Sequence, residues 1–290
     1  MAKVVRFTAG CAISVVFATL SIASAQVYTS IDFPGAIATV LNGGANPQGA
    51  SVGSYVDTSG VVHGFVVKKG VFTSSDPPGS TLTVAGWISP QGVIVGAYSD
   101  SRGVSRGFIL KGGKFTTVDF PGAAGTTLDG LNPSGEMSGF YCVSVALCDS
   151  NTNHSFTVSK EGVFTSFDPP GAVSSLAGPV NPSGAVVGAY TDSGGVLHGY
   201  LRYHGRFATI DFPGATSTFA GANNPQGDIV GQYTDTAGVI HAFLLSNGVF
   251  TSFDFPGATA TDAAGINPGG IIVGVYIDAA GGAHGFIRTP

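Results

Sequence analysis

The sequence has 290 residues, a formal net charge of −5 at pH 7, only 10% charged residues and 45 glycines. With no basic cluster, this composition excludes the electrostatic footprint of a nucleic-acid-binding protein and that of a protein held on an anionic membrane. The glycines follow no strict Gly-X-Y period, which excludes collagen, and regular apolar runs argue against a disordered chain.

The first 25 residues have the pattern of a cleaved secretory signal peptide. Lys3 and Arg6 precede an uncharged stretch that runs to Ile22, and Ala23-Ser24-Ala25 forms a small-x-small cleavage site. The apolar run is short for a membrane span, and no later stretch qualifies. We therefore expect residues 26–290 to form one domain in the periplasm, on the cell surface or in the medium of a bacterium, with no membrane span after cleavage.

A unit of about 43 residues repeats six times along the rest of the chain. Its markers are an Asp-x-Pro-Gly turn and an Asn-Pro-x-Gly turn, and successive turn aspartates are 44, 43, 49, 43 and 43 residues apart. Pro-Gly suits the centre of a type II turn because Pro presets the first φ and Gly accepts the positive second φ. A carboxylate can accept the backbone N–H groups of its own turn, so we expect these aspartates to be structural. They are Asp32, Asp76, Asp119, Asp168, Asp211 and Asp254.

Each unit contains four short runs rich in β-branched and aromatic residues, separated by turn signals. In the last copy they are residues 241–245, 249–253, 263–267 and 271–276. Four strands in about 43 residues is the size of a propeller blade. The chain is therefore predicted to be all-β, a six-bladed β-propeller of 24 strands.

The two ends of residues 26–290 complement each other. Residues 27–35 match the second run of a copy, and residues 284–290 match the first run. Pairing the last strand with the first closes the ring and removes two exposed sheet edges, which are an aggregation liability. We expect this closure to complete the N-terminal blade.

The motif His241-Ala242-Phe243, followed by Gly-Ile-Asn-Pro-x-Gly-x-Ile-Val-Gly-x-Tyr at residues 265–276, resembles the HAF-type extracellular repeat proteins of bacteria. The resemblance extends over essentially all of residues 26–290. It implies export and a repeat fold, and no general enzymatic activity. Most copies here read His-Gly-Phe or His-Gly-Tyr, and one reads Arg106-Gly107-Phe108.

A recurring Tyr, Asp and His share one face of a predicted hairpin in most copies. If residues 57–61 form a three-residue loop, Tyr55 lies opposite His63 and on the same face as Asp57. A metal or acid–base site is one interpretation, but a site is needed once, whereas a structural contact is needed in every blade. We expect a hydrogen-bonded clip, comprising Tyr55, Asp57, His63, Tyr190, Asp192, His198, Tyr233, Asp235, His241, Tyr276, Asp278 and His284.

Residues that break the repeat are the better candidates for a single binding site. Trp87 is the only tryptophan and replaces a small residue of the other copies. It could stack on a sugar or an apolar ligand, or fill a gap in the core. Arg102 and Arg106 lie in the same copy, and Arg106 replaces the clip histidine and is expected to contact Asp100.

Two further departures occur in copies three and five. Copy three has six extra residues and the pair Cys142 and Cys148, which an oxidising compartment would join as a disulfide. Two cysteines cannot complete a zinc site by themselves. This excursion is either a recognition loop or a tolerated insertion. In copy five, His204 is the only histidine outside the clip register, within a small basic cluster that is either a binding patch or a solvated hairpin.

These features predict an exported, non-enzymatic binding module for a carbohydrate or a cell-surface protein. Trp87, Arg102, Arg106 and His204 are the candidate ligand contacts. The alternatives are a propeller hydrolase or lyase with its site at the channel mouth, and a purely structural envelope protein. We expect no cofactor, no bound metal, no nucleic-acid partner and a monomer.

Overall fold

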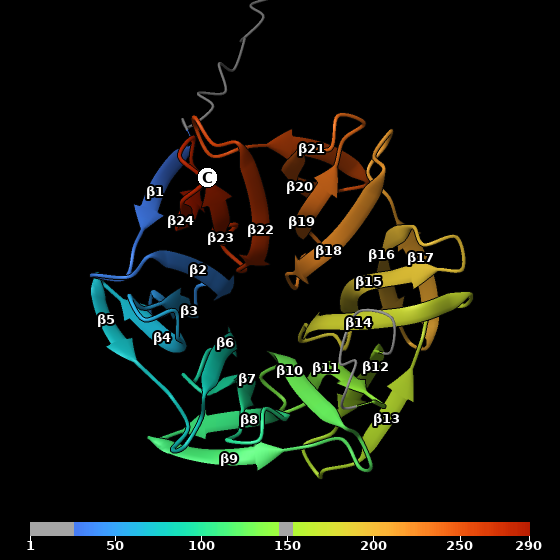
Figure 1. Ribbon diagram of the computed structural model, residues 1–290. Helices are drawn as coiled ribbons and strands as arrows, with labels where there is room; N and C mark the ends of the chain where they lie inside the picture. Colours follow the sequence, from blue (N-terminus) through green and yellow to red (C-terminus); the bar gives the residue numbers. More distant parts are fainter. Residues whose placement is uncertain (1–25, 145–152) are drawn as a thin grey trace, which may run out of the picture.

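The computed structural model describes residues 26–144 and 153–290, which form a ring of six four-stranded antiparallel sheets around a central channel (Figure 1). The predicted six-bladed β-propeller of 24 strands is confirmed. Among these residues no helix is long and apolar enough to cross a bilayer. The predicted signal peptide and Cys148 lie outside the described residues.

Each blade runs from an inner strand beside the channel to an outer strand at the rim. Blades 1 to 3 contain β2 (Ala38–Gly43), β3 (Ala50–Val56), β4 (Val62–Lys68) and β5 (Val71–Ser74); β6 (Leu82–Ile88), β7 (Ile94–Ser99), β8 (Ser105–Lys111) and β9 (Lys114–Val118); and β10 (Gly125–Leu131), β11 (Met137–Cys142), β12 (Asn153–Val158) and β13 (Phe164–Phe167). Blades 4 to 6 contain β14 (Ala172–Val180), β15 (Val186–Asp192), β16 (Leu197–Tyr203) and β17 (Arg206–Ile210); β18 (Ser217–Asn223), β19 (Ile229–Thr234), β20 (Ile240–Ser246) and β21 (Val249–Phe253); and β22 (Ala260–Ile266), β23 (Ile272–Ile277), β24 (Ala283–Thr289) and β1 (Val27–Ile31).

The ring closes in blade 6, where the first and last strands pair. Strand β1 pairs antiparallel with β24, from Val27 opposite Thr289 to Ile31 opposite Gly285. The N-terminal strand is therefore the outermost strand of a blade whose other three strands are C-terminal, and the two lie side by side in Figure 1. The pairing is as predicted, and it gives the last blade its fourth strand.

The inner strand of the last blade begins earlier than the sequence predicted. Strand β22 starts at Ala260, whereas the apolar run pointed to residue 263. Ala260 and Thr261 pair with Ile277 and Tyr276, so the ladder continues to the edge of the ring. Asp262 lines the channel cavity and Thr261 accepts a hydrogen bond from the Phe255 N–H, so this part of the strand shows no apolar pattern.

The largest side chain buried in the core of each blade is the aromatic residue of its His-Gly-Phe motif or of the equivalent triplet. This aromatic residue lies in the third strand of its blade and is at most 1% exposed, as in Phe65, Phe108, Phe156, Tyr200, Phe243 and Phe286. Because truncation of such a residue costs about 3–5 kcal/mol, these six rings account for a large part of the stability of the ring.

Strand direction gives the two faces of the ring different turns. The inner strands end at the Asn-Pro turns. These turns and the hairpins between the third and outer strands lie on one face, which we call the Asn-Pro face. The opposite face holds the hairpin loops that begin at the clip aspartates and the Asp-x-Pro-Gly turns, and we call it the histidine face. The two faces present different chemistry.

Candidate functional site

On the histidine face, each clip histidine joins two aspartates. His63 contacts Asp76 through Nδ1 at 2.8 Å and Asp57 through Nε2 at 3.3 Å. Tyr55 pairs with His63 across β3 and β4, the register that the sequence predicted. The turn aspartates and the clip residues, which the sequence analysis treated separately, form one cluster. The signal that could have shown this is the spacing of 13 or 14 residues between the histidine and the next turn aspartate in four blades.

The clip tyrosine is held between two rings. Tyr276 stacks on Phe255 with centroids 3.7 Å apart and planes 4° apart, and on His284 at 5.1 Å. Its hydroxyl donates to Ser30 at 3.0 Å. Phe255 belongs to the turn that leads into the same blade, so each stack ties a blade to the connection before it. The same arrangement recurs in blades 1, 3 and 5.

The recurring cluster leaves its titratable groups occupied with each other. Both nitrogens of His63 face a carboxylate, and Asp57 also accepts hydrogen bonds from the Ser59 hydroxyl and the Val61 N–H. The bond from Ser59 and then that from Val61 lower the pKa of Asp57 below its usual range. Within residues 26–144 and 153–290 no group of three or more His, Cys, Asp or Glu side chains has an arrangement that could hold a metal ion. The polar atoms of the cluster are paired with one another, and its structural role stays a prediction.

Arg106 takes the place of the histidine in blade 2. It donates to Asp119 from Nη1 at 2.7 Å, and its Nε lies 3.5 Å from Asp100. Arg102 is largely exposed and also contacts Asp100, at 3.1 Å. Both arginines are therefore paired on the histidine face, whereas Trp87 lies on the other face. The structure does not bring these candidates together into one site.

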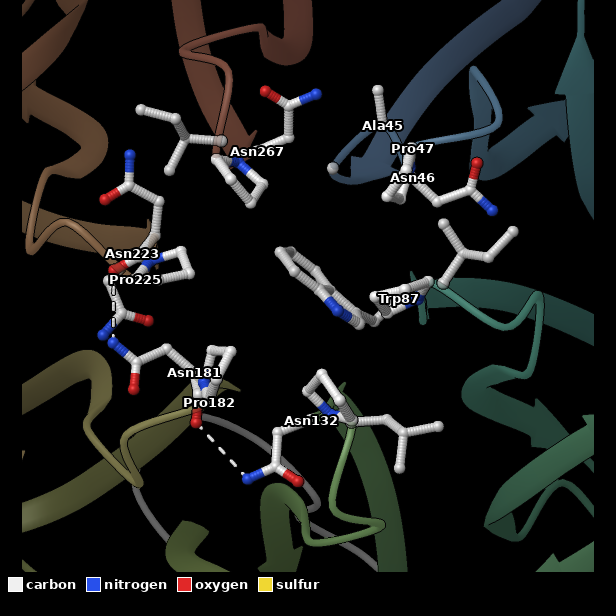
Figure 2. Close-up of a pocket in the computed structure, with 18 of the residues that line it drawn as sticks. Ala45, Asn46, Pro47, Trp87, Asn132, Asn181, Pro182, Asn223, Pro225 and Asn267 are labelled. Carbon is white, nitrogen blue, oxygen red and sulfur yellow. Dashed lines mark hydrogen bonds between the residues drawn. The ribbon is translucent and has the colours of Figure 1, made fainter.

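The Asn-Pro face has an apolar pocket at the mouth of the channel, with a volume of about 90 Å³ (Figure 2). The turn asparagines around it serve the ring: Asn46 accepts from the N–H groups of Gln48 and Ala50, and Asn132 donates to the Asn181 carbonyl of the next blade at 3.3 Å. The surface that remains is formed mainly by prolines and one indole, and no charged side chain lines it. The prolines are Pro47, Pro90, Pro133, Pro182, Pro225 and Pro268.

Trp87 lies in this pocket, at the end of β6. Figure 2 shows its ring reaching from the wall toward the centre of the channel. The half-buried indole packs against the core clusters that contain Leu131 and Ile266, and a methyl group added at Gly44 would meet its ring at 3.4 Å. The residue therefore fills part of the channel and also offers an aromatic surface to the pocket.

A second cavity, of about 190 Å³, adjoins this pocket between blades 4 and 5. The two share Asn181, Asn223 and Pro225 as lining residues. Asn223 is 5% exposed and donates to the Ala185 carbonyl at 3.3 Å, and its Oδ1 has no hydrogen-bond partner. The sequence analysis missed Asn223. The signal that could have found it is that the corresponding residues are all apolar, namely Ala45, Ile88, Leu131, Val180 and Ile266.

The remaining predicted contacts do not line these pockets, although His204 adjoins the second cavity through Tyr203. His204 is exposed in the hairpin after β16, with φ of 48°, and packs on Tyr203 with centroids 4.0 Å apart. Cys142 is buried at the end of β11, and because its predicted partner Cys148 lies outside the described residues, the disulfide stays a prediction.

Two aspartates that belong to no recurring position line the channel below Trp87. Asp129 lies on β10 and Asp262 on β22, in blades on opposite sides of the ring, and both border a cavity of about 210 Å³. Burial raises the pKa of Asp129 to about 7 and that of Asp262 to about 6. The sequence analysis did not pair them, because only the closed ring brings blades 3 and 6 to the same channel.

The histidines of the histidine face and the two channel aspartates predict a melting temperature that falls from pH 5 to pH 8. The hydrogen bond to Asp76 raises the pKa of His63 despite burial, and that to Asp32 does the same for His284. Stability from these histidines is complete below about pH 6.5 and is lost as pH rises through their raised values. The raised pKa values of Asp129 and Asp262 add a loss of stability that begins as pH rises above about 4 and is complete near pH 7. Calorimetry between pH 3 and pH 9 measures the profile.

Asp129→Asn is the control for the channel contribution. It should raise the melting temperature at pH 8 by roughly 4–8 °C, equivalent to about 2 kcal/mol, and leave it unchanged at pH 4, where the native carboxyl is protonated. Below pH 4 the protein should lose stability as Asp57 and Asp100 become protonated, since their folded-state pKa values are lowered. A melting temperature that rose from pH 5 to pH 8 would contradict the assignment.

Comparison with known proteins finds relatives in fold only. No family model matches the chain, and no curated protein matches it. The fucose-recognising lectin of Aleuria aurantia is 13% identical, with a TM-score of 0.53 over 86% of this chain and 90% of the lectin. A protein described as TolB from Agrobacterium tumefaciens is 14% identical, with a TM-score of 0.56 over 86% and 89%. A triple arginine mutant of AofleA from Arthrobotrys oligospora is 12% identical, with a TM-score of 0.51 over 89% and 81%.

Proposed function

We propose that this chain is an exported, non-enzymatic propeller that binds a neutral glycan on its Asn-Pro face. The observation that carries the proposal is the position of Trp87 in a proline-ringed pocket at the channel mouth. An indole presents a flat apolar face on which the C–H face of a sugar ring can stack. The pocket has no charged lining residue, which favours a neutral sugar over an acidic one.

Two further facts support this proposal. The solved propellers of similar fold include a fucose-specific lectin of Aleuria aurantia. In addition, the symmetric polar groups of this chain are already paired within the ring, so the asymmetric Asn-Pro face is where a single ligand finds unused surface. Export remains part of the proposal, on the pattern of residues 1–25.

Replacing the indole tests the proposal. Trp87→Gly introduces the residue of three sister blades and should weaken glycan binding about fivefold to tenfold, since stacking on an aromatic ring supplies about 1–1.4 kcal/mol. The measurement is a glycan array with residues 26–290, followed by calorimetric titration of each hit. Arg102→Ala, on the histidine face, is the matched control and should bind as the native protein does. Binding that survives in Trp87→Gly would refute the central pocket as the site.

An extracellular hydrolase is the second candidate, because Asp129 and Asp262 face one channel with raised pKa values, a property of general acids. This candidate requires turnover of a glycan or ester that Asp129→Asn abolishes without lowering the melting temperature. Binding without turnover supports the module, and the lack of both leaves the structural envelope protein.

A further inference from the structure

We propose that the cavity between blades 4 and 5 is a separate subsite for one neutral sugar unit, with the side-chain amide oxygen of Asn223, Oδ1, as the acceptor for a sugar hydroxyl. This inference rests on the proposed glycan-binding function and adds a second, polar subsite beside the apolar pocket of Trp87.

The first step is the unsatisfied amide. Asn223 lies in the seam between two blades, where the equivalent Ile88 packs against Ala50 between blades 1 and 2. Its Nδ2 must be the atom that faces the Ala185 carbonyl, since a carbonyl accepts only from a donor. This fixes the orientation of the amide and leaves Oδ1 as a buried acceptor without a partner. Such an atom costs stability, whereas the isoleucine of a sister blade would not.

The second step is the size of the space. On this measure a space of about 10–15 Å³ holds one water molecule, so a cavity of about 190 Å³ is much larger than is needed to satisfy one oxygen with one water. A ring of five or six atoms with its hydroxyl groups is a better match. Asn223 lines both this cavity and the central pocket, and the two adjoin through Asn181 and Pro225.

The third step is the chemistry of the walls. Leu201 and Ile229 provide an apolar side, and Tyr203, 44% exposed, adds an aromatic ring. Ser183 and Gln226 bring polar groups to the same lining. No charged side chain lines the cavity. A molecule with hydroxyl donors around an apolar ring face meets all of these features, and a uronic acid or another anion does not.

The experiment follows two side-chain signals at once by NMR on uniformly ¹⁵N-labelled residues 26–290. The Trp87 indole N–H is the only indole signal of the chain, and the Asn223 side-chain amide is identified by its loss in Asn223→Ile. The probes are glucose, galactose, mannose, fucose and N-acetylglucosamine, with glucuronate as the charged control. We expect at least one neutral sugar to shift the Asn223 amide and glucuronate to leave it in place.

Affinity and stability of Asn223→Ile complete the test. Its dissociation constant for the sugar that shifts the amide should rise at least tenfold, while its melting temperature should equal or exceed that of the native protein, because isoleucine is the residue of two sister blades. Tyr203→Leu leaves the Asn223 acceptor intact and should raise the dissociation constant for the same sugar several-fold.

The outcomes separate this subsite from the proposed function. Movement of the Trp87 indole with a stationary Asn223 amide would overturn the subsite and leave glycan binding in place. Movement of the Asn223 amide alone would support the subsite and refute the central pocket. If neither signal moves with any of the sugars, both proposals are wrong, and a shift with glucuronate alone would overturn the neutral ligand.

Discussion

Deletion of residues 284–290 is expected to abolish the cooperative thermal unfolding transition of this protein. These residues carry most of β24, including Phe286, which is fully buried, and Arg288, which is 6% exposed. They also hold β1 in the ring through the antiparallel ladder, and His284 donates to Asp32 at 2.7 Å. Loss of one buried phenylalanine costs about 3–5 kcal/mol, and a whole strand costs more than the 5–15 kcal/mol that stabilises a typical native protein.

Deletion of Pro290 alone is the matched control, because it removes no pair of the β1–β24 ladder, which ends at Thr289. Its melting temperature should stay within about 2 °C of the native value. Differential scanning calorimetry compares the two proteins. An intact transition after removal of residues 284–290 would mean that the five remaining complete blades form a stable unit and that closure through β24 is dispensable.

The fold could be predicted from the sequence because the residues that form its turns are adjacent in the chain. Gly and Pro mark each turn, and a turn type depends on only four residues, so the spacing of turns such as the one at Asp254 fixes the number of strands. The closure could be predicted because the two ends share the same repeat. The earlier start of β22 could not, since residues beside a channel need not be apolar.

The candidate site was less predictable because it depends on which residues meet across the ring. Trp87 was identified as an exception to the repeat, and the structure places it at the channel mouth. Arg102 and Arg106 are exceptions in the same copy but lie on the other face, since successive turns of a blade alternate between faces. Asn223 was missed because it is hidden beside the turn residue Asn224, and its meaning depends on the cavity formed with blade 4.

A glycine in the second strand of every blade is expected to be intolerant of a single methyl group. A Cβ at this position would overlap a backbone carbonyl oxygen of the inner strand, and for Gly231 that oxygen belongs to Phe219. The cause is the β-bulge in β18, where the register shifts between Ala220 and Ala222 and brings the backbone close. The equivalent positions are Gly53, Gly96, Gly139, Gly188 and Gly274.

Gly231→Ala should therefore lower the stability by about 3 kcal/mol, at the upper end of what overpacking costs, and the melting temperature by roughly 6–12 °C. The obstacle is a backbone atom held by the β18–β19 ladder, so it cannot move aside as a flexible side chain does. Chemical denaturation measures the free energy of unfolding directly. A midpoint equal to that of the native protein would show that the bulge can relax, in which case the glycines are not required by packing.

Gly269→Ala is the control that separates sterics from the general effect of replacing glycine. Gly269 lies in the exposed Asn-Pro turn of blade 6 without a positive φ, and a Cβ there would meet only Asn267 Oδ1, at 3.4 Å. Its stability should match or slightly exceed that of the native protein, because alanine restricts the unfolded chain. The contrast between the two variants would attribute the glycine that recurs in the second strand of each blade to close contact between that strand and the inner strand.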